Sequence, residues 1–554
     1  MEALPLALDK IYQWEKTKRS DVYLTQPIPG RGPEIYTWGE AVGQARKMAA
    51  YLKSLDLPES SNIAIISKNC AHWLMADMAI WMAGHVSVPI YPTANQETIS
   101  HVLDHCEAQA LFIGKLDDWD SQKRAVPKNL LTIGMPLFKG KAHEKWDHIL
   151  KDYPPLKTNP RRKPDDVATI IYTSGSTGVP KGVVHTFKTM AYASIHGDKE
   201  MNVTDQDRML SYLPLAHVFE RWVVELNSFY SGFQVYFAES LDTFVDDLRR
   251  AQPTIFVAVP RIWSKFQLSV FEKISPTKLS LIMATPILGR VVKKKILSQM
   301  GLDNCRFAAS GSAPLAASTL RWYRKLGLDL LEGYGMSENF GYSNFTRPGE
   351  SKIGYVGTPN PEVIQRIAAT GEIEVKSPTN MLGYYKDPQK TAETFTRDGY
   401  LKTGDVGYID QNGKLKITGR IKDTFKTSKG KYIVPARAEN ILDAHPYIEM
   451  SCVSGNGQPQ PFAMVQLSEH QGLRWKNANY RKEIELTLTM LREEVNKVLE
   501  SHERIQFIAV VNEPWTIESG YLTPTMKLKR HVIENEYNKA MEDWYQTEKK
   551  VVAI

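Results

Sequence analysis

The chain contains few cysteines and lacks an apolar run long enough to cross a bilayer. Its 554 residues include four cysteines, Cys70, Cys106, Cys305 and Cys452. They lie far apart and show no CxxC spacing, which fits a reducing cytoplasm and gives no disulfide framework. The longest apolar stretch, residues 74–90, contains Asp77 and His85 and is too short and too polar for a membrane span. The N-terminus carries Glu2 and Asp9 in place of a basic start followed by an apolar run, so we expect no secretory signal.

The chain also lacks a strong excess of one charge. A formal net charge of +7 is mild for this length and excludes a nucleic-acid footprint. It suits anionic substrates, or occasional contact with an acidic membrane surface. Hydrophobic residues at 42% and charged residues at 24% are those of an ordinary globular protein. We therefore expect a cytoplasmic protein, with peripheral contact at the inner membrane face left open.

The length and the residue pattern predict an α/β protein of at least two domains. In the first three hundred residues, helical and strand patterns alternate. Residues 37–40 form a capping box that opens a helix to about Leu52, and residues 63–66 and 254–259 are typical of buried strands. This alternation predicts parallel sheets with helices on both faces.

After Gly371 the pattern changes to short strands separated by turns. Asn412-Gly413 predicts a tight hairpin between two of these strands. Farther on, an amphipathic helix through residues 484–498 precedes a strand at 505–511. We place the boundary at about Lys422, which gives a large N-terminal domain of αβ subdomains and a β-rich subdomain (1–421) and a small α+β C-terminal domain (422–554).

Residues 171–182 (IYTSGSTGVPKG) are the most informative stretch of the chain. A buried strand ends in a loop of Gly, Ser and Thr, whose backbone N–H groups and hydroxyls can surround a polyphosphate, and Lys181 adds a positive charge. A flexible Ser/Gly linker is the alternative, but a linker does not normally follow a buried strand and end in Pro-Lys-Gly. The spacing of Gly175, Gly178 and Lys181 differs from the P-loop of nucleoside triphosphatases, and Pro180 lacks a backbone donor.

Together with five further motifs, this loop resembles the adenylate-forming enzymes: acyl- and aryl-CoA synthetases, luciferases and the adenylation domains of peptide synthetases. In order, the motifs are residues 171–182, 212–221 (YLPLAHVFER), 309–314 (ASGSAP), 332–338 (EGYGMSE), 400–407 (YLKTGDVG) with Gly419-Arg420, and 522–530 (LTPTMKLKR). The resemblance covers the chain from about Thr37 to Arg530.

The resemblance implies an ATP site, a magnesium site and a site for coenzyme A. The residues it assigns to the bound substrates are Thr173, Ser174, Gly175, Ser176, Thr177, Gly178, Lys181, Gly311, Ser312, Ala313, Glu332, Gly333, Tyr334, Gly335, Met336, Ser337, Asp405, Arg420, Lys422, Gly430 and Lys527. Those it assigns to catalysis are Lys527, Glu338, Lys181 and His217. Magnesium, an oxygen-seeking ion, would be held by Glu338 and the Thr173 hydroxyl, with Thr177 as the rival ligand.

Each implied role suits the chemistry of its side chain. Two anions must meet when a carboxylate attacks the α-phosphate of ATP, so the site needs cations that stabilise the transition state. Lys527 would reach the carboxylate and the α-phosphate, while Lys181 would face the departing pyrophosphate. Tyr334 offers a face to adenine, and Asp405, which only accepts hydrogen bonds when ionised, suits the ribose hydroxyls with Arg420 beside them.

The second half-reaction transfers the acyl group from AMP to a thiol, so Lys527 has to leave the site first. The resemblance implies that the small domain is mobile and rotates about a hinge at Lys422. The loop at 427–432, which contains Gly430, would then line the pantetheine tunnel, where a glycine allows close approach of the backbone.

The sequences of residues 214–221, 421–426 and 523–530 look most like the corresponding segments of long-chain acyl-CoA synthetases. The implied function is ATP-dependent activation of a long-chain fatty acid and its transfer to CoA. Phe219 or Trp222 is a candidate gate of an acyl tunnel, although aromatic side chains are more often simply core. Two alternatives stay open: a ligase that passes the acyl group to a carrier protein or another acceptor, and a non-catalytic sensor of acyl groups or nucleotides. The intact polar motifs disfavour the sensor.

Overall fold

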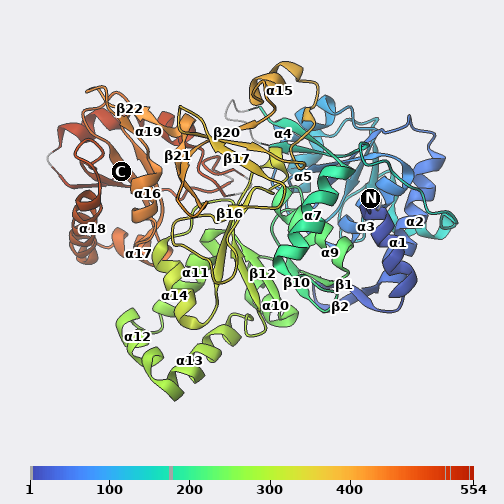
Figure 1. Ribbon diagram of the computed structural model, residues 1–554, viewed down its shortest axis with the longest axis horizontal. Coiled ribbons are helices and arrows are strands. Elements are labelled where there is room, and N and C mark those ends of the chain that lie inside the picture. Colours follow the sequence, from blue (N-terminus) through green and yellow to red (C-terminus); the bar gives the residue numbers. More distant parts are fainter. Residues whose placement is uncertain (1–3, 174–178, 518, 524–525, 548, 554) are drawn as a thin grey trace.

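The computed structural model describes residues 4–173, 179–517, 519–523, 526–547 and 549–553. Five residues predicted to bind phosphate lie outside the described residues: Ser174, Gly175, Ser176, Thr177 and Gly178. Figure 1 shows a large N-terminal domain and a smaller C-terminal domain, as the sequence predicts.

An eight-stranded sheet forms the first layer of the large domain, in the order β19-β9-β8-β4-β3-β5-β6-β7. Six neighbouring strands are parallel: β8 (Val167–Thr173), β4 (Val86–Ile90), β3 (Asn62–Ile66), β5 (Ala110–Ile113), β6 (Leu131–Gly134) and β7 (Glu144–Lys145). The parallel prediction does not extend to the remaining pairs of the sheet: β9 (Lys181–Thr186) is antiparallel to β8, and β19 (Gly383–Tyr384) is antiparallel to β9. β8 and β9 pair directly, with Thr173 opposite Lys181, so the predicted phosphate loop connects two neighbouring strands.

Two further sheets complete the αβ part of the large domain. One has the order β10-β11-β1-β2, with bounds Arg208–Ser211, Gln234–Phe237, Val22–Ile28 and Arg31–Thr37. The other has the order β12-β13-β14-β15-β16, with bounds Ile255–Ala258, Phe307–Ser310, Leu330–Tyr334, Asn344–Phe345 and Thr358–Pro359. The strands β12, β13 and β14 are parallel.

Helices pack against these sheets. They are α1 (Ala7–Thr17), α2 (Trp38–Ser54), α3 (Ala71–Ala83), α4 (Gln96–His105), α5 (Trp119–Gln122), α6 (Trp146–Asp152), α7 (Phe187–Met201), α8 (Val218–Glu220), the π-helix η2 (Arg221–Leu226), α9 (Asn227–Ser231), α10 (Phe244–Ala251), α11 (Pro260–Phe271) and α14 (Ala317–Leu326). The capping box is confirmed: the Glu40 N–H donates to the Thr37 hydroxyl, and the Thr37 N–H donates to the Glu40 carboxylate.

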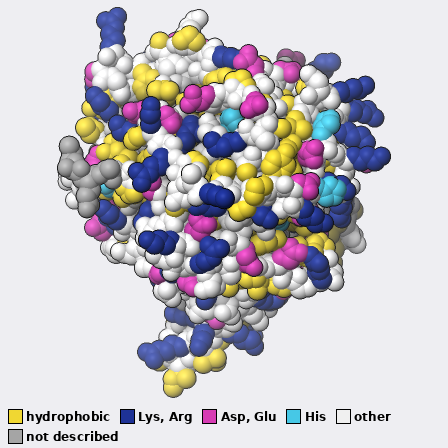
Figure 2. All heavy atoms as spheres, turned by 90° about the vertical axis from the view of Figure 1, so that its right-hand side faces the viewer, with side chains coloured by type: hydrophobic (Ala, Val, Ile, Leu, Met, Phe, Trp, Pro, Cys, Tyr) yellow, Lys and Arg dark blue, Asp and Glu magenta, His cyan; other side chains and the backbone are white. Residues whose placement is uncertain are grey.

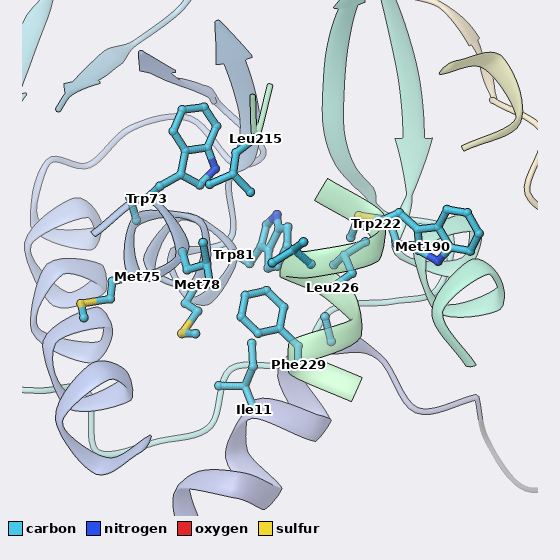
Figure 3. Close-up of a cluster of buried hydrophobic side chains, with 14 of the residues drawn as sticks. Ile11, Trp73, Met75, Met78, Trp81, Met190, Leu215, Trp222, Leu226 and Phe229 are labelled. Carbon is cyan, nitrogen blue, oxygen red and sulfur yellow. The ribbon is translucent and has the colours of Figure 1, made fainter. Parts of the chain in front are cut away.

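The central helix α3 is buried along its whole length, which explains why its sequence is almost entirely apolar. Figure 3 shows Trp81 of this helix beside Leu226 and Phe229. The rings of Trp81 and Phe229 meet edge to face at 6.1 Å between centroids. Asp77, the charged residue within the apolar stretch, is fully buried and pairs with Arg221 at 2.6 Å, because a buried carboxylate requires a partner.

A β-rich layer with the order β17-β18-β20-β21 leads to the small domain; its bounds are Ile364–Ile367, Glu372–Lys376, Leu401–Ile409 and Leu415–Arg420. The predicted hairpin is confirmed between β20 and β21, with Gly413 in the left-handed region at φ +74°. The strand β21 runs directly into the short helix η4 (Ile421–Asp423).

The small domain combines a sheet with helices, as predicted. Its elements are β22 (Phe425–Lys426), β23 (Tyr432–Ile433), α16 (Ala436–Leu442), β24 (Ile448–Ser454), β25 (Phe462–Leu467), α17 (Glu469–Lys476), α18 (Ala478–Val498), β26 (Ile508–Val510), α19 (Arg530–Gln546) and β27 (Val551–Ala553). The predicted strand at 505–511 is shorter than expected, because only three residues of β26 pair with β25.

A helical hairpin, α12 (Pro276–Ala284) and α13 (Pro286–Gln299), projects from the lower edge of the large domain (Figure 1). The sequence pattern gave no prediction for it. Across the described ranges, no helix is both long enough and apolar enough to span a bilayer.

Candidate active site

The predicted site residues gather where several strands end. Thr173 closes β8 and lies directly opposite Lys181, the first residue of β9. The segment 311–313 follows β13, and residues 335–338 follow the neighbouring parallel strand β14. Carboxyl ends of adjacent parallel strands meet at one edge of a sheet, which is where α/β proteins bind ligands. The sequence therefore brings its motifs to one place through strand topology.

Three predicted nucleotide residues form a hydrogen-bonded chain. The Tyr334 hydroxyl donates to the Asp405 Oδ2 at 2.7 Å, and the Arg420 Nε donates to the Asp405 Oδ1 at 2.8 Å. Asp405 is 3% exposed and lies opposite Arg420 on the β20–β21 ladder. Because both carboxylate oxygens already have donors, Asp405 is fixed in orientation before any ligand binds.

Glu338 is held in the helix η3 (Ser337–Asn339) by contacts from two other segments. Its Oε1 accepts a hydrogen bond from the Tyr384 hydroxyl at 2.7 Å, and its carbonyl accepts one from the Met381 N–H at 2.7 Å. His185 of β9 lies 2.7 Å from the Ser337 carbonyl and donates its Nε2–H to it. Burial lowers the pKa of His185 to about 4, so the ring is neutral at pH 7 and acts as a structural donor.

Tyr384 connects Glu338 with Lys181. The Lys181 Nζ lies 5.8 Å from the centre of the Tyr384 ring while the hydroxyl of that ring contacts Glu338. Sequence reasoning missed Tyr384, and no spacing could have linked it to Glu338, 46 residues away. His185 was missed too, although it follows the phosphate loop closely on β9.

A close backbone contact explains one of the predicted glycines, and an aromatic ring lies close to another. A Cβ at Gly335 would lie 2.1 Å from the Gly341 carbonyl oxygen, so no other residue fits there. A Cβ at Gly311 would lie 3.3 Å from the Phe219 ring. Ser312, beside it, adopts a left-handed backbone at φ +69°, an uncommon conformation for a residue with a side chain.

The Glu332 carboxylate braces the loop that contains Ala313. The Leu315 N–H donates to its carboxylate, and burial raises the pKa of Glu332 to about 7. Gly333 pairs with Phe345 on β15, and the Met336 N–H donates to the Asn339 side chain at 2.9 Å. These three residues shape the site through contacts within the protein.

Lys527 of the small domain reaches the site of the large domain. Two hydrogen bonds to Thr523 position it: the Lys527 N–H donates to the Thr523 hydroxyl at 3.0 Å, and the Thr523 N–H donates to the Lys527 carbonyl at 2.8 Å. Burial and the positive charge of Arg420 lower the pKa of Lys527 to about 8, while Asp405 and Glu338 act in the opposite direction. The Lys527 amine is therefore close enough to Arg420, Asp405 and Glu338 for their charges to shift its pKa.

His217 lies near Lys527, at the N-cap of α8. Burial, and next the charge of Lys527, lower the pKa of His217 to about 3, so its imidazole is neutral at pH 7. Its Nδ1 accepts a hydrogen bond from the Phe219 N–H at 3.3 Å, which leaves the proton on Nε2. The ring can therefore donate one hydrogen bond to a ligand but carries no positive charge.

Lys422 and Gly430 differ from each other in their relation to the site. Lys422 lies in η4, where burial and then the charges of Lys390, Lys181 and Arg420 lower its pKa. Its charge therefore faces the same site, and Lys390 of α15 (Pro388–Thr394) is a cation that sequence reasoning missed. Gly430 occupies an exposed turn between β22 and β23 at φ +77°. Among the described contacts, none joins Gly430 to the cluster around Asp405.

The donor groups fit a magnesium ion that is held partly by its substrate. Glu338 offers its second carboxylate oxygen, and Thr173 ends the strand beside the phosphate loop. Within the described residues there is no cluster of three or more His, Cys, Asp or Glu side chains that could form a complete protein cage. Magnesium is usually bound by one or two carboxylates together with substrate phosphates, so a single carboxylate is adequate.

The two candidate gate residues differ in packing. Trp222 lies in the π-helix η2, 8% exposed, against Gly197 and Gly341 and 5.8 Å from the Tyr342 ring. Phe219 contacts Gly311 next to the predicted adenine loop. Only a glycine at 197 leaves room for the Trp222 ring, since a Cβ there would lie 2.7 Å from it.

Comparison with known proteins identifies the family. Residues 13–385 match the family model described as "AMP-binding enzyme", and residues 422–549 match "AMP-binding enzyme C-terminal domain". A long-chain-fatty-acid–CoA ligase of Mycobacterium tuberculosis, FadD15, is 30% identical, over 97% of this chain and 96% of the relative. Human long-chain-fatty-acid–CoA ligase 1 is 29% identical, over 88% of this chain and 78% of the relative.

Solved structures share the fold. The anthranilate CoA ligase AuaEII in complex with anthranoyl-AMP has a TM-score of 0.79 at 20% identity, covering 98% of this chain and 99% of that one. The A-PCP didomain of the carboxylic acid reductase of Segniliparus rugosus, in complex with AMP, has a TM-score of 0.83 at 21% identity, covering 99% and 83%. The family models cover most of the chain, and the motifs converge on one site: this chain belongs to the AMP-binding enzyme family.

Proposed function

We propose that this protein activates a long-chain fatty acid with ATP to acyl-AMP and then transfers the acyl group to CoA, releasing AMP. The observation that carries the proposal is the position of Lys527. A lysine from the small domain lies among Asp405, Arg420, Glu338 and His217 of the large domain. The similarity to long-chain-fatty-acid–CoA ligases along nearly the whole chain supports the choice of acid.

In the first step a fatty acid carboxylate oxygen attacks the α-phosphorus of ATP. A new oxygen–phosphorus bond forms, and the bond to the pyrophosphate oxygen breaks. Lys527 would neutralise the carboxylate and the α-phosphate, and Lys181 would face the departing pyrophosphate. The neutral His217 would donate its Nε2–H to the substrate. Magnesium, held by Glu338 with Thr173 or Thr177, would supply charge stabilisation as negative charge moves to the leaving group.

The nucleotide is held by the hydrogen-bonded chain of Tyr334, Asp405 and Arg420. Asp405 would accept from the ribose hydroxyls, and the backbone around Gly311 and Gly335 would lie against adenine. The loop 174–178 would bind the β- and γ-phosphates. These assignments follow the family resemblance, and the donor and acceptor capacities of the side chains suit them.

In the second step the CoA thiol releases its proton to water, and its sulfur attacks the acyl carbon. A thioester forms, and the bond from the acyl carbon to the AMP oxygen breaks. Lys527 would occupy the space that the thiol needs, so we assign residues 1–421 and 422–554 to two bodies that rotate about Lys422. The exposed turn at Gly430 would then reach the site and line the pantetheine path.

A coupled assay of AMP release with short, medium and long fatty acids tests this function. We expect acyl-CoA, AMP and pyrophosphate, with long chains preferred; ADP would refute adenylate chemistry. Isotope exchange between pyrophosphate and ATP, dependent on fatty acid, separates an enzyme from a sensor. AMP release that does not respond to CoA would favour a carrier protein or another acceptor.

A further inference from the structure

The helical hairpin α12–α13 presents apolar side chains to solvent at its free end. Leu281 is 68% exposed, Ile287 82%, Leu288 54% and Val291 59%. Isolated exposed apolar residues are ordinary, but a cluster of large aliphatic side chains on one projecting element marks an interaction site. Figure 2 shows hydrophobic side chains at the tip of the lower projection.

The hairpin is a built element with its own buried side. Leu279 and Met283 of α12 and Ile296 of α13 are buried in the core of the large domain. A Cβ at Gly289 would lie 2.6 Å from the Met283 carbonyl oxygen, so the two helices meet at a position that requires glycine. The exposed apolar side is therefore the opposite side of a well-packed hairpin.

The charged residues of the hairpin are all basic. Between residues 276 and 299 there are five basic residues and no acidic one: Lys278, Arg290, Lys293, Lys294 and Lys295. All of them are exposed except Lys293, which is half-buried. In Figure 2 Lys and Arg side chains lie beside the apolar tip. The partner must therefore be anionic.

The order of apolar and basic residues along α13 matches the layers of a membrane surface. The helix has 14 residues, about 21 Å. Ile287, Leu288 and Val291 occupy its first half. The basic run Lys293 to Lys295 begins within about 5 Å of Val291 along the helix axis. If the tip of the hairpin enters the surface first, the apolar side chains at the start of α13 reach the acyl boundary, about 5–10 Å deep, while the cations farther along meet the lipid phosphates. The spacing fits that depth.

We propose that the α12–α13 hairpin is a docking element for anionic lipid bilayers. A second copy of the chain fits poorly, because two such hairpins would set five positive charges against five. The inference deepens the proposed function, since long-chain acids partition into bilayers, but its test does not depend on it.

Flotation of the full-length protein with lipid vesicles tests the proposal. One set is phosphatidylcholine alone, and the other is an equal mixture of phosphatidylcholine and phosphatidylglycerol. We expect stronger binding to the mixed vesicles, weakened by added salt because the basic residues are solvent-exposed. The variant Ile287→Ser/Leu288→Ser/Val291→Ser and the variant Lys293→Gln/Lys294→Gln/Lys295→Gln should each bind at least about tenfold more weakly.

A matched control alters exposed apolar residues elsewhere. Leu486 and Met490 on α18 are 62% and 56% exposed, and Leu486→Ser/Met490→Ser should bind as the unmodified protein does. Circular dichroism and a thermal melt establish that each variant is folded. Ile287→Cys carrying an environment-sensitive fluorophore should blue-shift on addition of mixed vesicles, and Leu486→Cys should not.

Hairpin variants that bind vesicles like the unmodified protein would overturn the proposal. The proposal would also fail if the unmodified protein did not bind mixed vesicles and the apolar variant had a lower mass than the unmodified protein in light scattering. That result would indicate that a second copy of the chain covers the hairpin. Fatty-acid-dependent pyrophosphate exchange without vesicles is measured in parallel. Exchange without vesicle binding would reject the docking element alone, and vesicle binding without exchange would reject the proposed function alone.

Discussion

Arg261 on α11 and Glu449 on β24 form an ion pair that joins the large domain to the small one. Arg261 also lies 4.0 Å from the sulfur of Met526, the residue before Lys527. This contact therefore belongs to the orientation in which Lys527 enters the site, and it has to break if the small domain rotates.

Arg261→Ala should slow adenylation without slowing thioester formation from synthetic acyl adenylate. The pair is about one-third exposed on the Arg261 side, so the loss should not exceed about fivefold. Pyrophosphate exchange and acyl-CoA formation, measured on one preparation, give the comparison. Arg31→Ala, which breaks a pair with Glu34 inside the large domain, is the control. Equal loss in both steps would contradict a role limited to this orientation.

Lys527→Ala should lower adenylation by on the order of a hundredfold or more, the scale for removing a preorganised group that stabilises developing charge. The same variant should still convert synthetic acyl adenylate to acyl-CoA, because the proposed rotation removes Lys527 from the site. Lys529→Ala, two residues along, should leave both steps nearly unchanged. A folded variant that loses both half-reactions together would show that Lys527 is not the adenylation lysine.

Adenylation should be slower at alkaline pH. Burial and Arg420 lower the pKa of Lys527 to about 8, so the ammonium form decreases as the pH rises through that value. The kcat/KM of pyrophosphate exchange should then fall by up to about tenfold per pH unit. Lys527→Arg, which stays charged, should be slower but should lose this alkaline decline. A decline that persists in the arginine variant would assign it to another group.

Lys422→Pro should leave adenylation largely intact and block overall turnover, because proline fixes φ at the residue assigned to the hinge. Lys422→Ala removes the same charge but keeps the backbone free, so it separates stiffness from electrostatics. Acyl-CoA formation should be lost in the proline variant and retained in the alanine variant. Equal loss of adenylation and turnover in the proline variant would place the hinge elsewhere.

Much of the site could be predicted from the sequence because its residues stand in short motifs at strand ends. Asp405 and Arg420 were expected side by side at the ribose, and the Asn412-Gly413 hairpin brings them opposite each other. Tyr384 could not be predicted, because its contact with Glu338 depends on β19 joining the edge of a sheet built from the first half of the chain.

The hairpin α12–α13 was missed for a different physical reason. Sequence patterns detect helices by an apolar side that packs and a polar side that faces water. Here Ile287, Leu288 and Val291 face solvent while Ile296 faces the core, so apolar residues surround much of the helix and the period is obscured. The feature that hides the helix from pattern analysis is the one that carries the docking proposal.

The lowered pKa of Lys527 would also couple the proposed rotation of the small domain to protons. With the small domain closed the pKa is about 8, whereas a lysine in water has a pKa near 10.5. The open form therefore binds protons more readily between these values, so opening takes up as much as one proton per molecule. Raising the pH through this window favours the closed form, by up to about tenfold per unit. The pH would thus change the preferred orientation of the small domain through the Lys527 amine alone.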